Sequence, residues 1–329
     1  MLLAALILTL SSTAAPSAAS TPHDVYGVGF GADELLPQTP RALELARQAD
    51  INWVRLGIYW QDVEPNPGQY DFSADDALVA STRANQLNVL AILAYSTTWS
   101  TSAPANPPVN LTHYPPRDYF EWAQYIATVV SRYKDDIHYW EVWNEPCLTE
   151  FWSGTAAQYA SLLALTYSTI KQIDPTGTVV LGGQAFIDLP DHDAGDLLAR
   201  ILADPDYPAA ASFDIAAFHY YQPPEQAPRW FERFKSTLSE FGVDDRPIWI
   251  TEAGAVTTGN LDAGLQTQAA WLDRTLPTLV DLGASRVFWF QLDENPYAPS
   301  GFGLLGPDLT PRPAYAALQG LVADTPAHA

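Results

Sequence analysis

The sequence is short of several features on which specialised proteins depend. Its 329 residues include a single cysteine, Cys147, which excludes a disulfide framework and a cysteine-ligated zinc or iron–sulfur site. Lys and Arg number 16 against 38 Asp and Glu, and the formal charge of −22 disfavours nucleic acid and anionic membrane surfaces. After residue 20, no apolar run reaches the roughly 18 residues that a membrane-spanning helix needs. Beyond the N-terminus we therefore expect neither a nucleic-acid partner nor a membrane partner.

Hydrophobic and aromatic residues, by contrast, are plentiful. Hydrophobic residues make up 47% of the chain, which is typical of a packed globular protein and not of a disordered one. The sequence has 11 tryptophans and 16 tyrosines, whereas only 16% of its residues are charged. This composition suits a neutral, ring-shaped ligand, and it favours carbohydrate as the partner.

The first twenty residues have the composition of a secretory signal peptide. An apolar stretch, Leu2–Leu10, is followed by small residues, and Ser17 and Ala19 supply the small-x-small pattern of a cleavage site. We expect cleavage near Ala19 and a secreted protein, extracellular or periplasmic. The alternative is a buried N-terminal helix of the folded domain.

Short apolar, β-branched runs alternate with amphipathic segments at intervals of about 30 to 50 residues, as in βα units. The predicted strands are Val25–Phe30, Trp53–Ile58, Val89–Tyr95, His138–Trp143, Thr178–Gly183, Asp214–Tyr221, Pro247–Glu252 and Arg286–Gln291. The predicted helices are Thr39–Gln48, Ala74–Gln86, Arg117–Tyr133, Ala156–Ile173, Ala194–Leu202, Arg229–Phe241, Gly264–Leu282 and Pro313–Leu321. Eight such units predict an α/β protein, a (β/α)8 TIM barrel that forms a single domain over residues 21–329. A doubly wound open sheet is the alternative.

Two loops at the carboxyl end of this barrel are expected to shape a ligand site. One is the proline-rich segment Ala103–Pro116, which contains an N-glycosylation sequon at Asn110. The other is Gln184–Asp193. The way these loops close the cleft would decide which sugar is bound and whether cleavage is exo or endo.

Two of the predicted strands end in a glutamate. Glu145 follows the fourth strand and precedes Pro146, and Glu252 ends the seventh strand just before Gly254. Catalytic groups of a barrel lie at the carboxyl ends of its strands, and burying ionised carboxylates costs several kcal/mol unless they are paired. Chemistry that needs two facing carboxylates and neither metal nor cofactor is glycoside hydrolysis. A separation of about 5 Å would predict retention of configuration, and a wider gap would predict inversion.

Three motifs identify a family resemblance. They are the segment Trp60–Phe72, which is similar to a "W…EP.PG.YDF" loop, the run Trp143-Asn144-Glu145-Pro146, and the pair Thr251-Glu252. With them the chain resembles the clan A retaining glycoside hydrolases, most closely the cellulase-type groups related to families 5 and 39. Many family 5 enzymes have a histidine at the end of the third strand, where this chain has Tyr95 and Ser96. This departure favours a family 39-like or unclassified branch over a strict family 5 assignment.

The resemblance implies roles for four polar residues. Glu145 would be the general acid and then the general base, and Glu252 would be the nucleophile. Asn144 would donate a hydrogen bond to the substrate 2-hydroxyl, and Arg55 would steady the nucleophile. The implied protein is a secreted retaining hydrolase of O-glycosidic bonds in a plant or microbial β-glycan or its oligosaccharides, active in polysaccharide degradation.

The resemblance also implies roles for a histidine–tyrosine pair and for tryptophans. His219 and Tyr221 match the family His-x-Tyr pair, and strand alternation puts both on one face and Tyr220 on the other. Trp289 on the eighth strand would form the floor beneath the sugar. Trp99 lies on a loop at the same end and would extend this platform, as would two further loop tryptophans, Trp60 and Trp152.

Other residues favour structural explanations. Glu141 lies an even number of residues before Glu145, so a strand would put both side chains on the same face. Glu141 is therefore expected to point into the barrel and pair with a cation. The six histidines show no H-x-x-x-H or H-x-H spacing of a zinc site. The run Gly27–Ala32 loosely fits a dinucleotide fingerprint, but Asp33 and Glu34 would repel a pyrophosphate. We therefore expect no metal and no cofactor.

Two other functions use the same features. A transglycosylase would have the same pair of glutamates and differ in whether a sugar or water takes up the intermediate. A non-catalytic glycan-binding barrel would keep the aromatic residues but need neither Glu145 nor Glu252.

Overall fold

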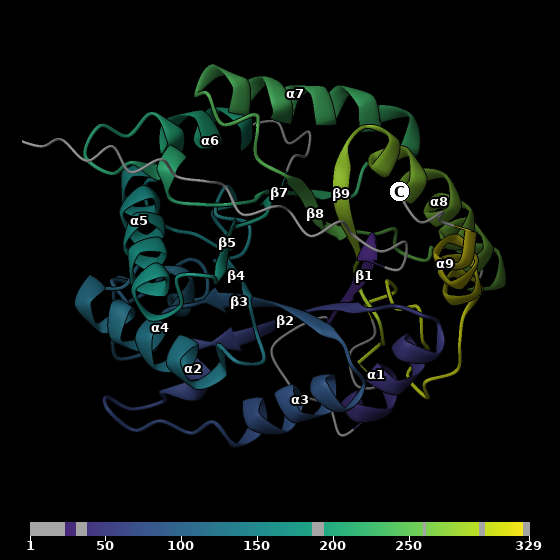
Figure 1. The fold of residues 1–329 in the computed structure, drawn as a ribbon, viewed down its shortest axis with the longest axis horizontal. Coiled ribbons are helices and arrows are strands. Elements are labelled where there is room, and N and C mark those ends of the chain that lie inside the picture. The colour runs from purple at the N-terminus through teal and green to yellow at the C-terminus, as the bar shows by residue number, and fades with distance from the viewer. Residues whose placement is uncertain (1–23, 31–37, 186–193, 259–260, 296–299, 325–329) are drawn as a thin grey trace, which may run out of the picture.

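The structure, a computed structural model, describes residues 24–30, 38–185, 194–258, 261–295 and 300–324 (Figure 1). The predicted signal peptide, residues 1–20, and most of the loop Gln184–Asp193 lie outside this part. Among the described residues, no helix has the length and apolar character that crossing a bilayer requires.

The strands of the described chain form one parallel sheet. Their order in the sheet is β5-β4-β3-β2-β1-β9-β8-β7-β6. The strands are β1 (Tyr26–Gly29), β2 (Trp53–Tyr59), β3 (Asn88–Ala94), β4 (Tyr139–Val142), β5 (Thr178–Leu181), β6 (Gln184–Ala185), β7 (Ala216–Tyr220), β8 (Ile248–Ala253) and β9 (Ala284–Trp289).

The sheet closes on itself through β5 and β6, which follow one another along the chain. β5 pairs with β4, and β6 pairs with β7. Between them, Val180 forms a parallel bridge with Ile215, and the backbone N–H of Leu181 donates to the carbonyl of Ile215 at 2.9 Å. Because β4 and β7 thus lie on either side of the same chain segment, the sheet is a closed barrel, as Figure 1 shows from one end. This arrangement agrees with the predicted (β/α)8 architecture and not with an open sheet.

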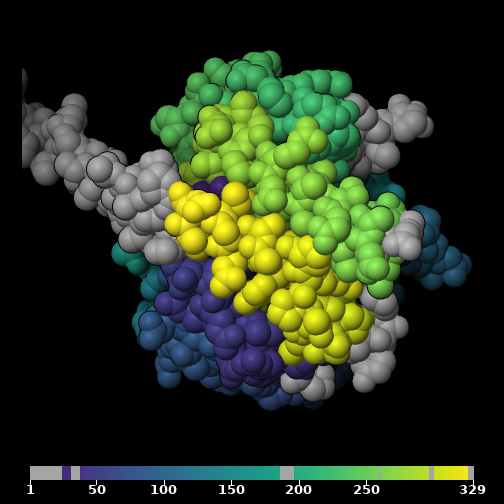
Figure 2. Space-filling model, turned by 90° about the vertical axis from the view of Figure 1, so that its right-hand side faces the viewer, coloured from purple at the N-terminus to yellow at the C-terminus, as the bar shows by residue number. Residues whose placement is uncertain are grey.

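Helices surround the barrel. They are α1 (Thr39–Gln48), α2 (Trp60–Val63), α3 (Ser73–Ala84), α4 (Tyr119–Tyr133), α5 (Ala156–Ile173), α6 (Ala194–Leu202), α7 (Ala227–Glu240), α8 (Leu261–Asp281) and α9 (Pro313–Asp324). The last helix packs beside the first, because the Tyr315 hydroxyl donates to the carbonyl of Leu45 at 2.7 Å. Figure 2 shows α9, in yellow, lying between the purple N-terminal elements and the green α8.

The predicted elements all have counterparts, and three helices have the predicted bounds: α1, α5 and α6. The sharp start of α5 has a local cause. Thr155 caps the helix by accepting from the Gln158 N–H, while the Gln158 side chain accepts from the Thr155 N–H. The predicted strand Thr178–Gly183 is wrong in one respect, because it ends at Leu181 and a second short strand follows Gly183. The short helix α2 has no counterpart among the predicted helices.

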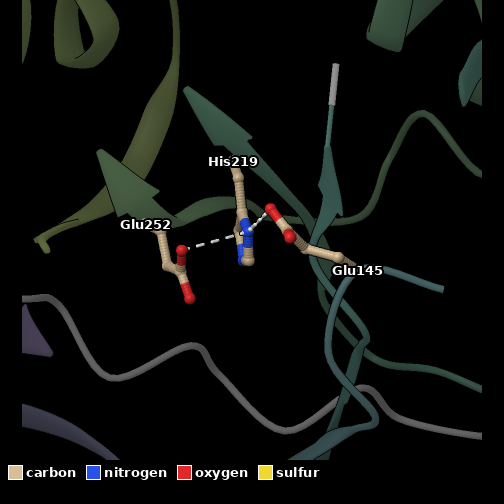
Figure 3. A group of neighbouring side chains, drawn as sticks. All are labelled: Glu145, His219 and Glu252. Carbon is tan, nitrogen blue, oxygen red and sulfur yellow. Dashed lines mark hydrogen bonds and ion pairs between the residues drawn. The ribbon is translucent and has the colours of Figure 1, made fainter. Parts of the chain in front are cut away.

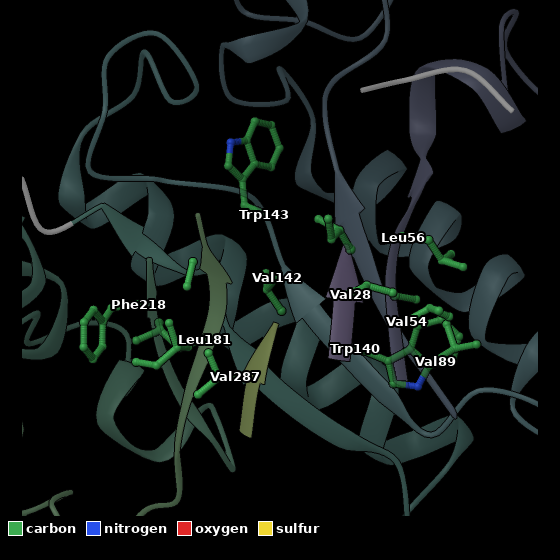
Figure 4. Packing of buried hydrophobic residues seen from close by; sticks show 14 of the residues in the cluster. Val28, Val54, Leu56, Val89, Trp140, Val142, Trp143, Leu181, Phe218 and Val287 are labelled. Atoms are coloured by element: carbon green, nitrogen blue, oxygen red, sulfur yellow. The ribbon is translucent and has the colours of Figure 1, made fainter. Parts of the chain in front are cut away.

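The barrel has two hydrophobic cores. The larger lies between the sheet and the helices, and Figure 4 shows part of it, with Val54, Val142 and Leu181 among the labelled residues. The smaller is inside the barrel, because its members come from alternate positions of six strands: Trp53, Leu90, Val180, Ile215, Ala217, Trp249 and Phe288. Arg286 lies over two of these rings, 3.7 Å from the centre of Trp53 and 4.4 Å from that of Trp249. Trp53 and Trp249 are thus core residues.

The outer core predicts the stability effect of a matched pair of substitutions. Phe234 on α7 is 0% exposed and packs 4.7 Å from the Phe218 ring of β7, whereas Phe120 on α4 is 68% exposed. Phe234→Ala is expected to lower the free energy of unfolding by about 3–5 kcal/mol. Phe120→Ala is expected to change it by no more than about 0.5 kcal/mol. Urea unfolding of both variants checks this, and equal losses would contradict the assignment of the core.

Candidate active site

The two strand-end glutamates meet at the carboxyl end of the barrel. Glu145 follows β4, Glu252 lies on β8, and His219 lies on β7 between them (Figure 3). One carboxylate oxygen from each glutamate and one ring nitrogen of His219 lie within 4.8 Å of one another. All three side chains are buried. The structure therefore brings together two carboxylates that are about 107 residues apart in sequence.

The chain reaches this arrangement by leaving regular strand geometry after Val142. Trp143 has φ 70° and Glu145 has φ 43°, both in the left-handed region that residues with a side chain rarely adopt. Each such residue costs on the order of 1–3 kcal/mol. The distortion turns the Trp143 ring outward, where it packs 5.8 Å from Trp122 of α4. Asn144 and Glu145, although adjacent, can then both face the site.

Arg55 on β2 donates hydrogen bonds to three side chains at the site. Its Nη1 donates to Glu252 Oε1 at 2.5 Å, and its Nη2 donates to Asn144 Oδ1 at 2.9 Å. Its Nε donates to Glu141 Oε2 at 2.6 Å. The predicted pairing of Glu141 with a cation inside the barrel is thus confirmed, and the cation is Arg55. The guanidinium is 2% exposed and has an acceptor for each of its three nitrogens.

The charges around Glu252 favour its ionised form. Burial alone would raise the pKa of this carboxyl, but His219, Arg55 and the hydrogen bond from Tyr221 outweigh burial, and the pKa lies below its ordinary value. Burial likewise works against the charge of Arg55, whereas Glu141 and then Glu252 raise the pKa of its guanidinium well above the usual range. Glu252 is therefore a carboxylate at neutral pH, as a nucleophile must be.

His219 on β7 contacts both glutamates, and Tyr221, directly after β7, contacts Glu252. His219 Nδ1 lies 2.8 Å from Glu145 Oε1 and 3.4 Å from Glu252 Oε2. The Tyr221 hydroxyl donates a hydrogen bond to Glu252 Oε2. Tyr220, on the other face, is buried and stacks 6.2 Å from Trp271 of α8. The predicted division of these residues between the two faces of the strand is confirmed.

The imidazole of His219 rests against the break between β5 and β6. A Cβ at Gly183 would lie 2.1 Å from His219 Nε2 and 2.7 Å from Thr251 Oγ1, so only glycine fits at this position. This close approach lies within the predicted strand Thr178–Gly183, just after the point at which β5 ends. Burial lowers the pKa of His219, but the two glutamates, Glu252 first, raise it above the usual value.

The same three side chains are the group of described residues that could hold a metal ion. Several of their atoms already have partners, since Nδ1 of His219 bonds Glu145 and both oxygens of Glu252 accept from Arg55 and Tyr221. The adjacent guanidinium would also repel a cation. We therefore assign no metal to the site.

Trp289 is not brought to the two glutamates, and its predicted role as the sugar floor needs correction. It is 0% exposed and lies on the helix side of β9, with its ring 5.8 Å from Trp271. The reason is strand alternation, because Phe288 belongs to the core inside the barrel and its neighbour must face outward. The next inward position is Phe290, which is partly exposed and lies 6.3 Å from the Tyr221 ring.

Phe302 is a further aromatic residue at the site that the sequence analysis missed. It comes from the loop after β9, and its ring lies 5.7 Å from Tyr221 and 5.6 Å from Phe290. Alternation along β9 could have identified Phe290. No local pattern identifies Phe302, because its position depends on how the loop folds back over the barrel.

The loop tryptophans divide into buried and half-buried residues. Trp60 and Trp152 are 0% and 3% exposed and pack among other rings, so they do not form a sugar platform. Trp99 is half-buried, and its Nε1 donates to the Glu64 carbonyl at 3.0 Å. Its contact with substrate stays a prediction. Glu64 itself accepts from Trp60 Nε1 and from the Gly68 N–H, both at 2.7 Å, so the Trp60–Phe72 motif folds around one buried carboxylate.

The raised pKa of His219 predicts how its contribution to stability depends on pH. A group with a raised folded-state pKa contributes stability that is complete below its unfolded pKa of about 6.5 and is lost as pH rises through the folded value. The difference in unfolding free energy between the wild type and His219→Gln is therefore expected to shrink as pH increases from about 6 to 9. Urea unfolding across this range measures it. A difference that stays constant or grows would contradict the arrangement of charges.

Comparisons with known proteins agree with this geometry. A family profile described as Cellulase (glycosyl hydrolase family 5) matches residues 17–294. A β-xylosidase of Geobacillus stearothermophilus is 28% identical over 231 residues, which cover 61% of this chain and 45% of that protein. The chain thus spans less than half the length of this relative.

Solved structures share the fold. A family 39 glycoside hydrolase from Bacteroides cellulosilyticus WH2 has a TM-score of 0.70 at 23% identity, covering 92% of this chain and 64% of that one. A monomeric β-xylosidase from Caulobacter crescentus has a TM-score of 0.74 at 18% identity, covering 94% and 70%. At these identities the similarity concerns the fold alone. Since the family profile covers more than half of the chain, the protein belongs to the cellulase family, glycosyl hydrolase family 5.

Proposed function

We propose that the protein hydrolyses β-glycosidic bonds with retention of configuration, with Glu145 as acid/base and Glu252 as nucleophile. The observation that carries this proposal is the spacing of the two carboxylates, whose nearest ligand atoms lie within 4.8 Å. Retaining enzymes place their carboxyl groups about 5–5.5 Å apart, whereas inverting enzymes need about 6.5–9.5 Å to admit a water molecule.

The environments of the two glutamates support different roles. Glu252, ionised beside Arg55, attacks the anomeric carbon while Glu145 gives its proton to the leaving oxygen, and a covalent glycosyl–enzyme forms as the alcohol departs. Glu145, now a carboxylate, takes a proton from water, and that water displaces Glu252 from the sugar. His219 contacts both side chains and can accommodate the shift of charge between them.

Polar and aromatic groups are placed to hold the sugar. Asn144 Oδ1 accepts from Arg55, so its amide NH2 is the end that can donate to a sugar hydroxyl. Phe290 and Phe302, beside Tyr221, offer the apolar surface that we assign to the face of the sugar ring.

The substrate we propose is a β-glycan or an oligosaccharide derived from one. The named relatives include β-xylosidases, which makes aryl β-xylosides the first substrates to test. We further propose that the protein acts outside the cell, on the strength of the signal-like composition of residues 1–20.

Removal of the nucleophile tests the proposed function. Glu252→Ala is expected to reduce turnover of an activated aryl β-glycoside by about 10⁴-fold or more, because no covalent intermediate can form. Azide should restore part of the activity and give an α-glycosyl azide, the inverted product. Product configuration by ¹H NMR checks this outcome.

The matched control is Glu145→Ala. Here the intermediate still forms from a substrate with a good leaving group, and azide should give the β-glycosyl azide, the retained product. Wild-type activity in Glu252→Ala would overturn the assignment. Binding of oligosaccharide without turnover by the wild type would instead indicate a glycan-binding barrel.

A further inference from the structure

We propose that Glu141, a residue with no part in the two chemical steps, is a positioning residue that fixes Arg55 against Glu252 and Asn144 and limits how strongly Arg55 acts on the nucleophile. The proposal rests on the proposed function, because it assigns Glu252 as the nucleophile. It concerns a side chain that lies one layer below the reacting groups.

The contacts of Glu141 join three strands of the barrel and the segment between β5 and β6. Its Oε2 accepts from Arg55 Nε of β2 at 2.6 Å. Its Oε1 accepts from the Gly183 N–H, between β5 and β6, at 2.9 Å, and from Thr251 Oγ1 of β8 at 3.0 Å. Glu141 itself lies on β4 and is 0% exposed. A buried carboxylate with three donors has one well-defined position, and the same holds for the guanidinium that it contacts.

This position matters because of what the partners of Glu141 touch. Arg55 reaches Glu252 and Asn144 with its other two nitrogens. Thr251 precedes Glu252 in sequence, and Gly183 supports the imidazole of His219. The Glu141 carboxylate therefore bonds to neighbours of Glu252, Asn144 and His219.

The charge of Glu141 has a separate effect. Arg55 is a single cation between two acidic residues, Glu141 and Glu252, with a nitrogen 2.6 Å from one carboxylate and 2.5 Å from the other. Without the negative charge of Glu141, the full field of the buried guanidinium would act on Glu252. The carboxylate would then be held more firmly in its ionised form, and its nucleophilicity would fall.

The other charged and titratable groups around Glu252 are few. Among the described residues, Arg55 faces it from β2, His219 from β7, Glu145 from the segment after β4 and Tyr221 from the segment after β7. Besides Glu252 itself, Glu141 is the carboxylate that pairs with Arg55 among the described residues, and it is the acceptor for Arg55 Nε.

The experiment compares Glu141→Gln with the wild type. Glutamine keeps the shape and can still accept from Arg55 through its amide oxygen, but it lacks the charge. We expect kcat to fall and the acid limb of the kcat/KM–pH profile, which reports ionisation of Glu252 in the free enzyme, to move to lower pH by about one unit. Glu141→Asp keeps the charge but shortens the reach, so kcat should fall while the acid limb stays in place.

Glu294→Gln is the matched control. Glu294 is also 0% exposed and also paired with an arginine, Arg312, at 2.8 Å, but its other hydrogen bonds go to the loop after β9. The acid limb of the kcat/KM–pH profile of Glu294→Gln should not move. An unmoved acid limb in Glu141→Gln, or an equal shift in Glu294→Gln, would overturn the proposal.

A measurement without turnover separates this proposal from the proposed function. Titration of ¹³C-labelled glutamate carboxyls by NMR, with Glu252 assigned from Glu252→Gln, should show a lower midpoint for Glu252 in Glu141→Gln than in the wild type. If this shift is present but the azide experiment fails, the positioning role holds and the chemistry assigned to Glu252 does not. If the midpoint is unchanged, the positioning role is wrong whatever the enzyme activity.

Discussion

The site depends on one buried cation. Arg55 is among only 16 Lys and Arg residues in a chain with 38 acidic ones, and it lies inside the barrel with 2% of its surface exposed. A buried charge is tolerated only when each of its polar groups has a partner, and removing one partner of a buried pair costs about 3–5 kcal/mol. Glu141, Asn144 and Glu252 supply those partners. The positions of the amide and of one carboxylate are therefore fixed by the requirement to satisfy the guanidinium, before any substrate is bound.

In the loops around the site, buried carboxylates are stabilised largely by backbone N–H groups, in a chain with few cations. Glu294 accepts from backbone N–H groups of Ser300, Gly301 and Gly303 as well as from Arg312, and these bonds hold its pKa below the usual value although burial opposes them. Glu64 organises the loop after β2 in a similar way, through the Gly68 N–H. An acidic chain can thus bury carboxylates where backbone donors converge. The loop folded around Glu294 is the one that carries Phe302 to the site.

The sequence predicts those parts of the molecule that follow local rules. The start of α5 follows from its capping box at Thr155, and both glutamates are identifiable because parallel strands end at the same face of a barrel. Predictions fail where a residue's neighbours come from distant segments. Trp60 is an aromatic residue of the kind that binds sugar rings, but aromatic rings of α4 enclose it. Trp289 matches a family position, yet alternation from Phe288 turns it toward α8 and leaves Phe290 facing inward.

Departures from regular strand geometry are concentrated at the site, and convergence is their common cause. A regular strand sends every second side chain to the same face, about 6–7 Å apart, which is too far for neighbours to contact one ligand atom. The left-handed residues Trp143 and Glu145, and register shifts in β7 beside His219 and in β8 before Ala253, relax this spacing. At Gly183 the adjacent strands approach so closely that a Cβ is excluded. At the site, therefore, regular strand geometry gives way where several strands must present side chains to one point.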